Sequence, residues 1–138
     1  MGNAAAQYIL GGQLDNGSFE GYRNVNFAIH LFRKSAEQGY SDAQTILGLH
    51  YLIGDIVPEN RSLALGYFLE AAKQGDNLAQ VRSGTIYLRR CNLEKGESCK
   101  KAYYWLSEAV KNGNSEAKNE LKKCVIQIYA VNILVFIT

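Results

Sequence analysis

The sequence predicts an all-α fold: a right-handed α-solenoid of two-helix repeats, closed by a C-terminal capping helix. Three segments of the 138-residue chain end alike, with final glycines 36 and 38 residues apart, at Gln38-Gly39, Gln74-Gly75 and Asn112-Gly113. Small and apolar residues recur before each ending at helical spacing. Such a period is typical of solenoids. We expect one domain with repeats at 3–39, 40–75 and 76–113 and a partial copy at 114–138.

The composition favours a compact globular protein. The chain is 47% hydrophobic, which supplies enough apolar residues for a buried core, and its formal net charge is only +2. Lys and Arg are interspersed with Glu. This pattern predicts neither a nucleic-acid groove nor a membrane-binding face.

The first helix of each repeat, here called helix A, is expected to bury a stripe of small and apolar residues. In the second repeat this stripe is Ala43, Leu47 and Tyr51, at i, i+4 and i+8. The same pattern starts at Ala6 in the first repeat and at Ala79 in the third. Polar residues precede the helices, and Ser41 with Gln44 fits a capping box.

The second helix, helix B, is expected to pack against helix A through small residues. In the second repeat it carries Ala64, Tyr67, Phe68 and Ala71, and Ala28 and Ala102 occupy the place of Ala64 in the other two repeats. The fourth, partial copy begins at Asn114, with Ala117 and Leu121 on a helix A stripe. That helix is expected to cap the array.

Residues 43–75 closely resemble the Sel-1-like repeat (SLR) family, a relative of the tetratricopeptide repeat. The residues that carry the likeness are Leu47-Gly48-Leu49-His50-Tyr51, Gly54, Val57, Asn60, Ala64, Tyr67, Ala71-Ala72 and Gln74-Gly75. The flanking copies follow the pattern less closely, because their inter-helix loops are longer. The resemblance spans about residues 3–124 and implies a non-catalytic scaffold that binds proteins.

The resemblance also implies a concave groove lined by helix A, opposite its packing stripe. A helical wheel at roughly 100° per residue assigns eight residues to that groove: Tyr8, Thr45, Leu49, Leu52, Val81, Thr85, Leu88 and Arg89. This mixed polar and apolar surface favours an extended or irregular protein segment over a charged peptide carboxylate. Alternatively, some of these residues pack within the superhelix.

Two inter-helix loops, 15–24 and 89–101, form a second candidate partner surface, because insertions in repeats gather at one edge. Phe19 and Tyr22 would be unusual aromatics in an exposed turn. Either they contact a partner or they fix the loop to helix B.

The cysteines and histidines predict no metal site, no cofactor and no catalytic residue. Cys91 and Cys99 flank one loop, so a disulfide between them is feasible in an oxidising compartment and would leave Cys124 free. Such a bond would favour the periplasm. His30 and His50 have no Asp, Cys or second His at a catalytic spacing in the sequence.

The C-terminal segment from Cys124 to Thr138 has fifteen residues without a charge. It is shorter than the roughly 20 apolar residues of a membrane-spanning helix. It is expected to cap the last repeat, or else to form a homodimer contact or be covered by a partner.

We therefore expect a bacterial protein–protein interaction scaffold or adaptor. The first alternative is an immunity protein that neutralises a cognate toxin or secreted effector through the two loops. The weakest alternative is a cell-wall or β-lactamase-type enzyme, because no nucleophile–base pair is visible in the sequence.

Overall fold

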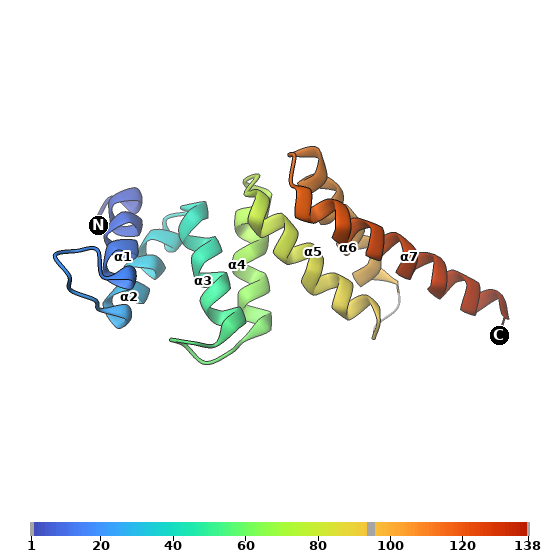
Figure 1. The fold of residues 1–138 in the computed structure, drawn as a ribbon, viewed down its shortest axis with the longest axis horizontal. Helices are drawn as coiled ribbons and strands as arrows, with labels where there is room; N and C mark the ends of the chain where they lie inside the picture. The colour runs from blue at the N-terminus through green and yellow to red at the C-terminus, as the bar shows by residue number, and fades with distance from the viewer. Residues whose placement is uncertain (1, 94–95, 138) are drawn as a thin grey trace. The chain divides into compact units, whose positions relative to one another are not determined.

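The computed structural model describes residues 2–93 and 96–137, with side chains up to residue 132. The predicted loop 89–101 and the apolar segment 124–138 therefore fall partly outside the described residues. The described chain is all-α, as predicted, and its seven helices are α1 (Ala4–Asn16), α2 (Val25–Glu37), α3 (Ser41–Ile53), α4 (Arg61–Lys73), α5 (Asn77–Cys91), α6 (Glu97–Lys111) and α7 (Ser115–Ile137) (Figure 1).

The helices pack in consecutive pairs, α1 with α2, α3 with α4 and α5 with α6, which is the arrangement of an SLR solenoid. The chain forms two compact units, 1–76 with α1 to α4 and 77–138 with α5 to α7. In the second unit, α7 packs on α6 and, less extensively, on α5.

Asparagine side chains start several helices by accepting a hydrogen bond from a free backbone N–H. Asn3, Asn24 and Asn60 cap α1, α2 and α4 at 3.0, 3.0 and 2.9 Å, and Asn114 accepts from Ala117 N–H at 3.0 Å. The predicted capping box of Ser41 and Gln44 is wrong. Tyr40 is the N-cap of α3 and makes no side-chain capping bond.

The Gln44 side chain instead joins the two helices of its repeat. Its Oε1 accepts a hydrogen bond from Gln74 Nε2 at 2.9 Å. The other repeats have an equivalent bond, from Gln38 to Gln7 at 2.7 Å and from Asn112 to Gln80 at 2.9 Å. The end of helix B is thus fixed to the start of helix A in each repeat.

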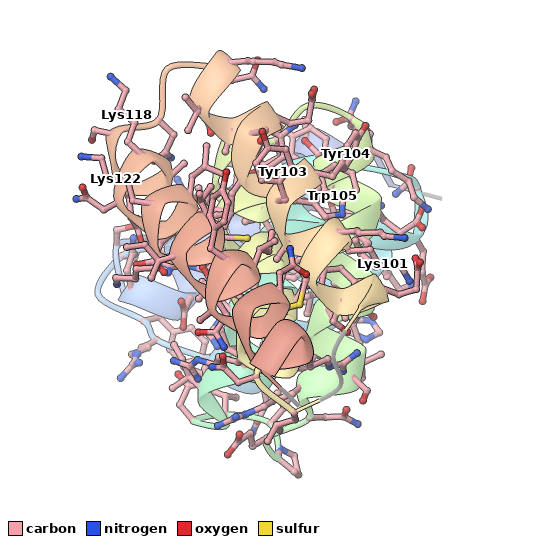
Figure 2. All side chains as sticks on the ribbon, turned by 90° about the vertical axis from the view of Figure 1, so that its right-hand side faces the viewer. Lys101, Tyr103, Tyr104, Trp105, Lys118 and Lys122 are labelled. Atoms are coloured by element: carbon pink, nitrogen blue, oxygen red, sulfur yellow. A yellow bond between two sulfur atoms is a disulfide. The ribbon has the colours of Figure 1, made fainter. Side chains whose placement is uncertain are left out.

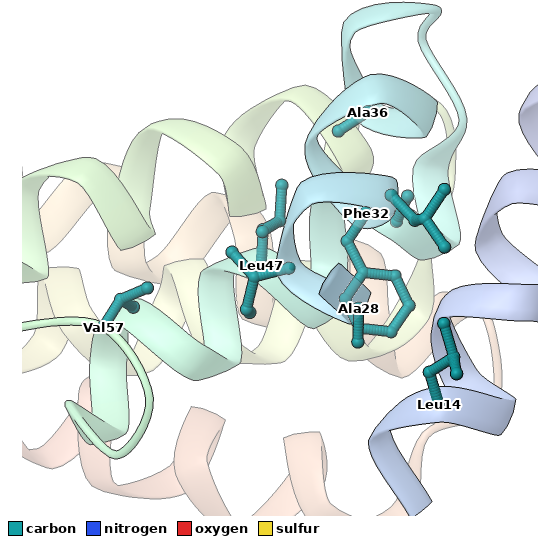
Figure 3. Packing of buried hydrophobic residues seen from close by; sticks show 9 residues of the cluster. Leu14, Ala28, Phe32, Ala36, Leu47 and Val57 are labelled. Atoms are coloured by element: carbon teal, nitrogen blue, oxygen red, sulfur yellow. The ribbon is translucent and has the colours of Figure 1, made fainter. Parts of the chain in front are cut away.

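The core of the first unit lies between helices A and B. Leu14, Ala28, Phe32, Ala36, Leu47 and Val57 are among its buried residues (Figure 3). Helix A and helix B approach closely at a glycine of helix A, five residues after Ala6 in the first repeat and after Ala43 in the second. A Cβ atom at Gly11 would lie 2.8 Å from the Phe32 ring, and one at Gly48 would lie 2.6 Å from the Phe68 ring.

The second unit uses the same close approach with a different residue. A Cβ atom at Gly84 of α5 would lie 2.6 Å from Leu106 of α6. The start of α7 covers this pair, since Ala117 and Cys124 are fully buried. Beyond Cys124 the helix becomes more exposed, and Ile126 keeps 68% of its surface accessible. Within the described residues, no helix is long and apolar enough to cross a membrane.

Replacing Gly48 by alanine should destabilise the protein by about 1–3 kcal/mol, because the new methyl group overlaps the buried Phe68 ring. Gly66 is the matched control, since it lies inside α4 with no atom near its Cβ position. Gly66→Ala should stabilise by about 0.5–1 kcal/mol through helix propensity. Urea unfolding followed by circular dichroism measures both. Equal effects of the two changes would contradict the close-approach account.

Candidate functional site

A groove of about 400 Å³ runs between α5 and α7 in the second unit. We call it the α5–α7 groove, and it is lined by Thr85, Leu88, Arg89, Asn92, Glu120, Lys123 and Gln127. The lining is mostly polar, with Leu88 as its apolar part. A surface of this kind suits a protein segment that brings both hydrogen-bonding groups and an apolar side chain.

Two successive A helices form this groove with the same helical stripe. Thr85 stands six residues after Ala79 of α5, and Lys123 stands six residues after Ala117 of α7. Arg89 and Gln127 both stand ten residues after the same alanines. Because both alanines are fully buried in the packing stripe, positions six and ten face away from it on each helix.

The charges in the groove are only partly paired. Lys123 Nζ lies 2.6 Å from Glu120 Oε1. Arg89 is exposed and makes no hydrogen bond or ion pair with another described residue. The groove thus offers a free guanidinium beside the amides of Asn92 and Gln127. These groups can bind a carboxylate and the backbone amides of a bound segment.

The structure brings together only three of the eight predicted groove residues, namely Thr85, Leu88 and Arg89. Val81 is fully buried against Ala109 and Ala117, so its assignment to the groove is wrong. The helical wheel placed Val81, two residues after Ala79, on the groove side of helix A. In the structure this position packs against the helices that follow, α6 and α7.

The predicted groove residues of the first unit are more buried than expected. Thr45 is only 6% exposed, while Leu49 and Leu52 are half-buried. The ring of Tyr8 packs against Phe32 and Tyr40, with centroid separations of 5.9 and 5.4 Å. Burial, together with the nearby Asp42 carboxylate, raises the pKa of the Tyr8 phenol. Tyr8 therefore contributes mainly to helix packing.

Four groove residues were not predicted: Asn92, Glu120, Lys123 and Gln127. Three of them belong to the partial fourth copy, which was expected mainly to cap the array. The repeat spacing contained the necessary signal, because Ala117 occupies the same place in α7 as Ala79 in α5.

The loop 15–24 presents its aromatic rings to solvent. Phe19 and Tyr22 are 42% and 58% exposed. The loop holds its own shape, because Tyr22 N–H donates to Phe19 O at 2.7 Å and Arg23 Nε donates to Asp15 O at 2.6 Å. Its two rings therefore remain a candidate contact surface.

His50 is not isolated, contrary to the expectation from its sequence neighbours. Its Nδ1 lies 3.1 Å from Asp55 Oδ1, and its Nε2 lies 4.0 Å from Asp15 Oδ2. The ring also stacks on Phe32 at 6.2 Å. Burial acts to raise the pKa of Asp55, but the hydrogen bonds from His50 and from Ile56 N–H together hold that pKa below its usual value. These contacts connect the end of α1 to the α3–α4 loop.

The predicted cysteine pair is joined in the structure by a disulfide between Cys91 and Cys99. The bond connects the last turn of α5 to the first turn of α6, next to Asn92 of the groove. Cys124 is free and fully buried, and burial raises the pKa of its thiol. Among the described residues, no group of three His, Cys, Asp or Glu side chains could hold a metal ion.

Comparison with protein-family models matches the Sel1 repeat at residues 4–40, 41–76 and 78–114. The chain belongs to the Sel1 repeat family. The matched ranges differ by one or two residues at each end from the predicted repeats. By this numbering, α7 begins directly after the third Sel1 repeat.

Two solved Sel1-type structures are similar to this chain. A protective antigen of uropathogenic Escherichia coli with an SLR fold is 38% identical, with a TM-score of 0.81, over 91% of this chain and 26% of the antigen chain. A Sel1 repeat protein from Oxalobacter formigenes is 30% identical, with a TM-score of 0.77, over 87% of this chain and 88% of that one.

Curated relatives include regulators of chitin synthase. Chitin synthase regulatory factor 4 of Schizosaccharomyces pombe is 28% identical over 88% of this chain, and the chitin synthase regulator SKT5 of Malassezia restricta is 27% identical over 88%. This chain spans only 18% and 8% of their respective lengths.

Replacing Asp55 by asparagine should make the stability of this Sel1 repeat protein less dependent on acid pH. The pKa of Asp55 is lowered from 3.8 by folding, so its stabilising contribution is complete above that value and is lost as pH falls through the lower, folded-state pKa. Urea titrations between neutral pH and about pH 2.5 test this. The difference from wild type should be largest at neutral pH and shrink below the usual pKa of aspartate.

Glu59→Gln is the matched control for Asp55→Asn. Glu59 lies in the same loop and forms an ion pair with Arg61 in which both side chains are at least half exposed. Such pairs contribute little to stability, so this variant should resemble wild type at every pH. A constant difference between Asp55→Asn and wild type across the whole pH range would contradict the assignment.

Protein purified without reductant should show no reactive thiol when native and one, Cys124, after unfolding in denaturant. All three cysteines should react after reduction and unfolding. Reduction should lower the free energy of unfolding by about 2–3 kcal/mol, because the disulfide closes a short loop in the unfolded chain. Titration with a chromogenic thiol reagent gives the count. Three thiols in the unreduced, unfolded protein would contradict the disulfide.

Proposed function

We propose that this chain is a non-catalytic scaffold or adaptor that binds an extended segment of a partner protein in the α5–α7 groove. The observation that carries the proposal is the repeated stripe on α5 and α7, which aligns Thr85 and Arg89 with Lys123 and Gln127. The segment would direct a carboxylate to Arg89 and its backbone amides to the Asn92 and Gln127 side chains. Since α5 and α7 already form the groove, binding needs little reorganisation.

The relatives support a regulatory role. The names of the fungal proteins describe regulators of chitin synthase, and this chain matches only a part of each of those proteins. Regulation through contact with another protein would suit a groove that offers hydrogen-bonding groups. We transfer only this general role, and not chitin synthase itself, to the present chain.

The exposed rings of Phe19 and Tyr22 favour a second candidate, an immunity protein that neutralises a bacterial toxin or effector through its loops. Aromatic side chains are frequent among the residues that dominate tight interfaces. Both solved relatives described above come from bacteria. The Cys91–Cys99 disulfide supports an oxidising compartment such as the periplasm.

The test is site-specific photo-crosslinking in the native cell, with a benzophenone side chain placed at Gln127 in the groove or at Lys73 on the exposed face of α4. A groove-binding partner should crosslink from position 127 and not from position 73. The affinity of that partner should then fall at least about tenfold for Arg89→Glu with Lys123→Glu, because both changes put negative charge in the groove.

Two control variants separate the candidates. Arg61→Glu with Lys73→Glu makes the same change in net charge on exposed residues of α4 and should keep full affinity. Phe19→Ala with Tyr22→Ala removes the loop rings. If only the loop variant lost affinity for the partner, the proposal of groove binding would be wrong and the immunity protein that binds through its loops would be favoured.

A further inference from the structure

In each of the three repeats, helix B covers one particular face of helix A. The stripe of helix A starts at Ala6, Ala43 or Ala79, and we number positions from this alanine. The covered face begins with the glutamine one residue later, whose side chain accepts a hydrogen bond from the residue at the end of helix B. Five residues after the alanine, a glycine contacts a buried side chain of helix B. In the second repeat these residues are Gln44 and Gly48; in the third they are Gln80 and Gly84.

Helix α7 has the same face, but no described helix covers it. The hollow over this face has a volume of about 610 Å³ and is lined by Val110 of α6 and by Lys118, Leu121, Lys122, Val125 and Ile126 of α7. We call it the α6–α7 hollow. Leu121 and Val125 occupy the places of Leu47 and Tyr51. Leu47 is fully buried by its repeat, whereas Leu121 and Val125 are only half-buried.

Two lysines replace the residues that receive helix B in the repeats. Lys118 stands in place of Gln44, and Lys122 stands in place of Gly48. Both lysines are exposed, and Figure 2 shows them projecting from the same side of α7. They are one helical turn apart, so their charges act together at one edge of the apolar hollow.

Lys122 prevents a helix B of the repeat type from occupying the hollow. Even a single Cβ atom at Gly48 would lie 2.6 Å from the Phe68 ring of helix B. A lysine at the equivalent place must keep its ammonium group hydrated or paired. The occupant therefore has to differ from helix B where it meets Lys118 and Lys122.

A second copy of this chain fits the hollow poorly. A symmetric dimer through this surface would place Lys118 and Lys122 of both copies in one interface, because such an interface uses the same patch twice. Four lysines, with no acidic residue among the described lining of the hollow, disfavour that association.

We infer that the α6–α7 hollow binds an amphipathic helix of a partner protein whose apolar stripe is bordered by Asp or Glu. The apolar stripe covers Val110, Leu121 and Val125, as a helix B covers the equivalent face in the repeats. The bordering carboxylates pair with Lys118 and Lys122. This surface is separate from the α5–α7 groove, since Lys123, the next residue after Lys122, lines the groove instead.

The test uses two synthetic helical peptides with an identical leucine stripe, one bordered by Glu and the other by Lys. Fluorescence anisotropy should show that the full chain prefers the Glu peptide by about tenfold, since two ion pairs replace two repulsions. Lys118→Glu with Lys122→Glu should reverse that preference. Ile126→Ser, at a residue 68% exposed, should weaken the Glu peptide several-fold without changing helicity.

The matched control is Lys73→Glu with Lys100→Glu, which changes net charge equally at two lysines that are 62% and 77% exposed elsewhere. It should keep the preference for the Glu peptide. Four outcomes would overturn the inference: no binding, equal binding of both peptides, a dimer broken by Lys122→Glu, or binding of anionic phosphatidylglycerol vesicles in place of the peptide. None of these outcomes decides whether a partner binds in the α5–α7 groove, because that proposal is tested by the Arg89→Glu and Lys123→Glu variants.

Discussion

The contact between the glycine of helix A and the large buried side chain of helix B determines the rest of each repeat. Gly11, Gly48 and Gly84 allow Phe32, Phe68 and Leu106 to lie against the backbone of the facing helix. Phe68 and Leu106 have no exposed surface, and Phe32 is 1% exposed, so these contacts form the centre of the packing. Any larger residue at the glycine would move the two helices apart.

Once this face of helix A is committed to helix B, the other faces acquire fixed roles. The glutamine near the start of helix A is directed to the end of helix B, where it satisfies the amide of Gln74 or its equivalent. The residues six and ten positions after the buried alanine of helix A do not face helix B. In α5 and α7 these residues line the groove. In α7, Lys122 stands in place of the helix A glycine on the pairing face, and Lys123, about 100° further round the helix, lines the groove instead.

The sequence was sufficient to predict the fold because the spacing of alanine and glycine reflects local helix packing. It was less informative about the site, because a helical wheel gives the direction of a side chain but not the neighbour that covers it. Val81 and Thr45 were placed in the groove for this reason, although both are buried. The contact of His50 with Asp15 was missed because Asp15 is 35 residues away in the chain and lies at the end of another helix.

In the binding mode proposed for the groove, Arg89 should dominate the choice of partner. Lys123 and Glu120 form an ion pair and largely neutralise one another, so they add polarity to the groove without a strong preference for either sign of charge. Arg89 has no ion-pair partner among the described residues, so its positive charge determines the net charge of the groove lining. It lies two residues before Cys91, whose bond to Cys99 attaches the end of α5 to α6. The disulfide restrains the backbone at the end of α5, so in the proposed binding mode mainly the side chain of Arg89 has to become ordered when a carboxylate binds.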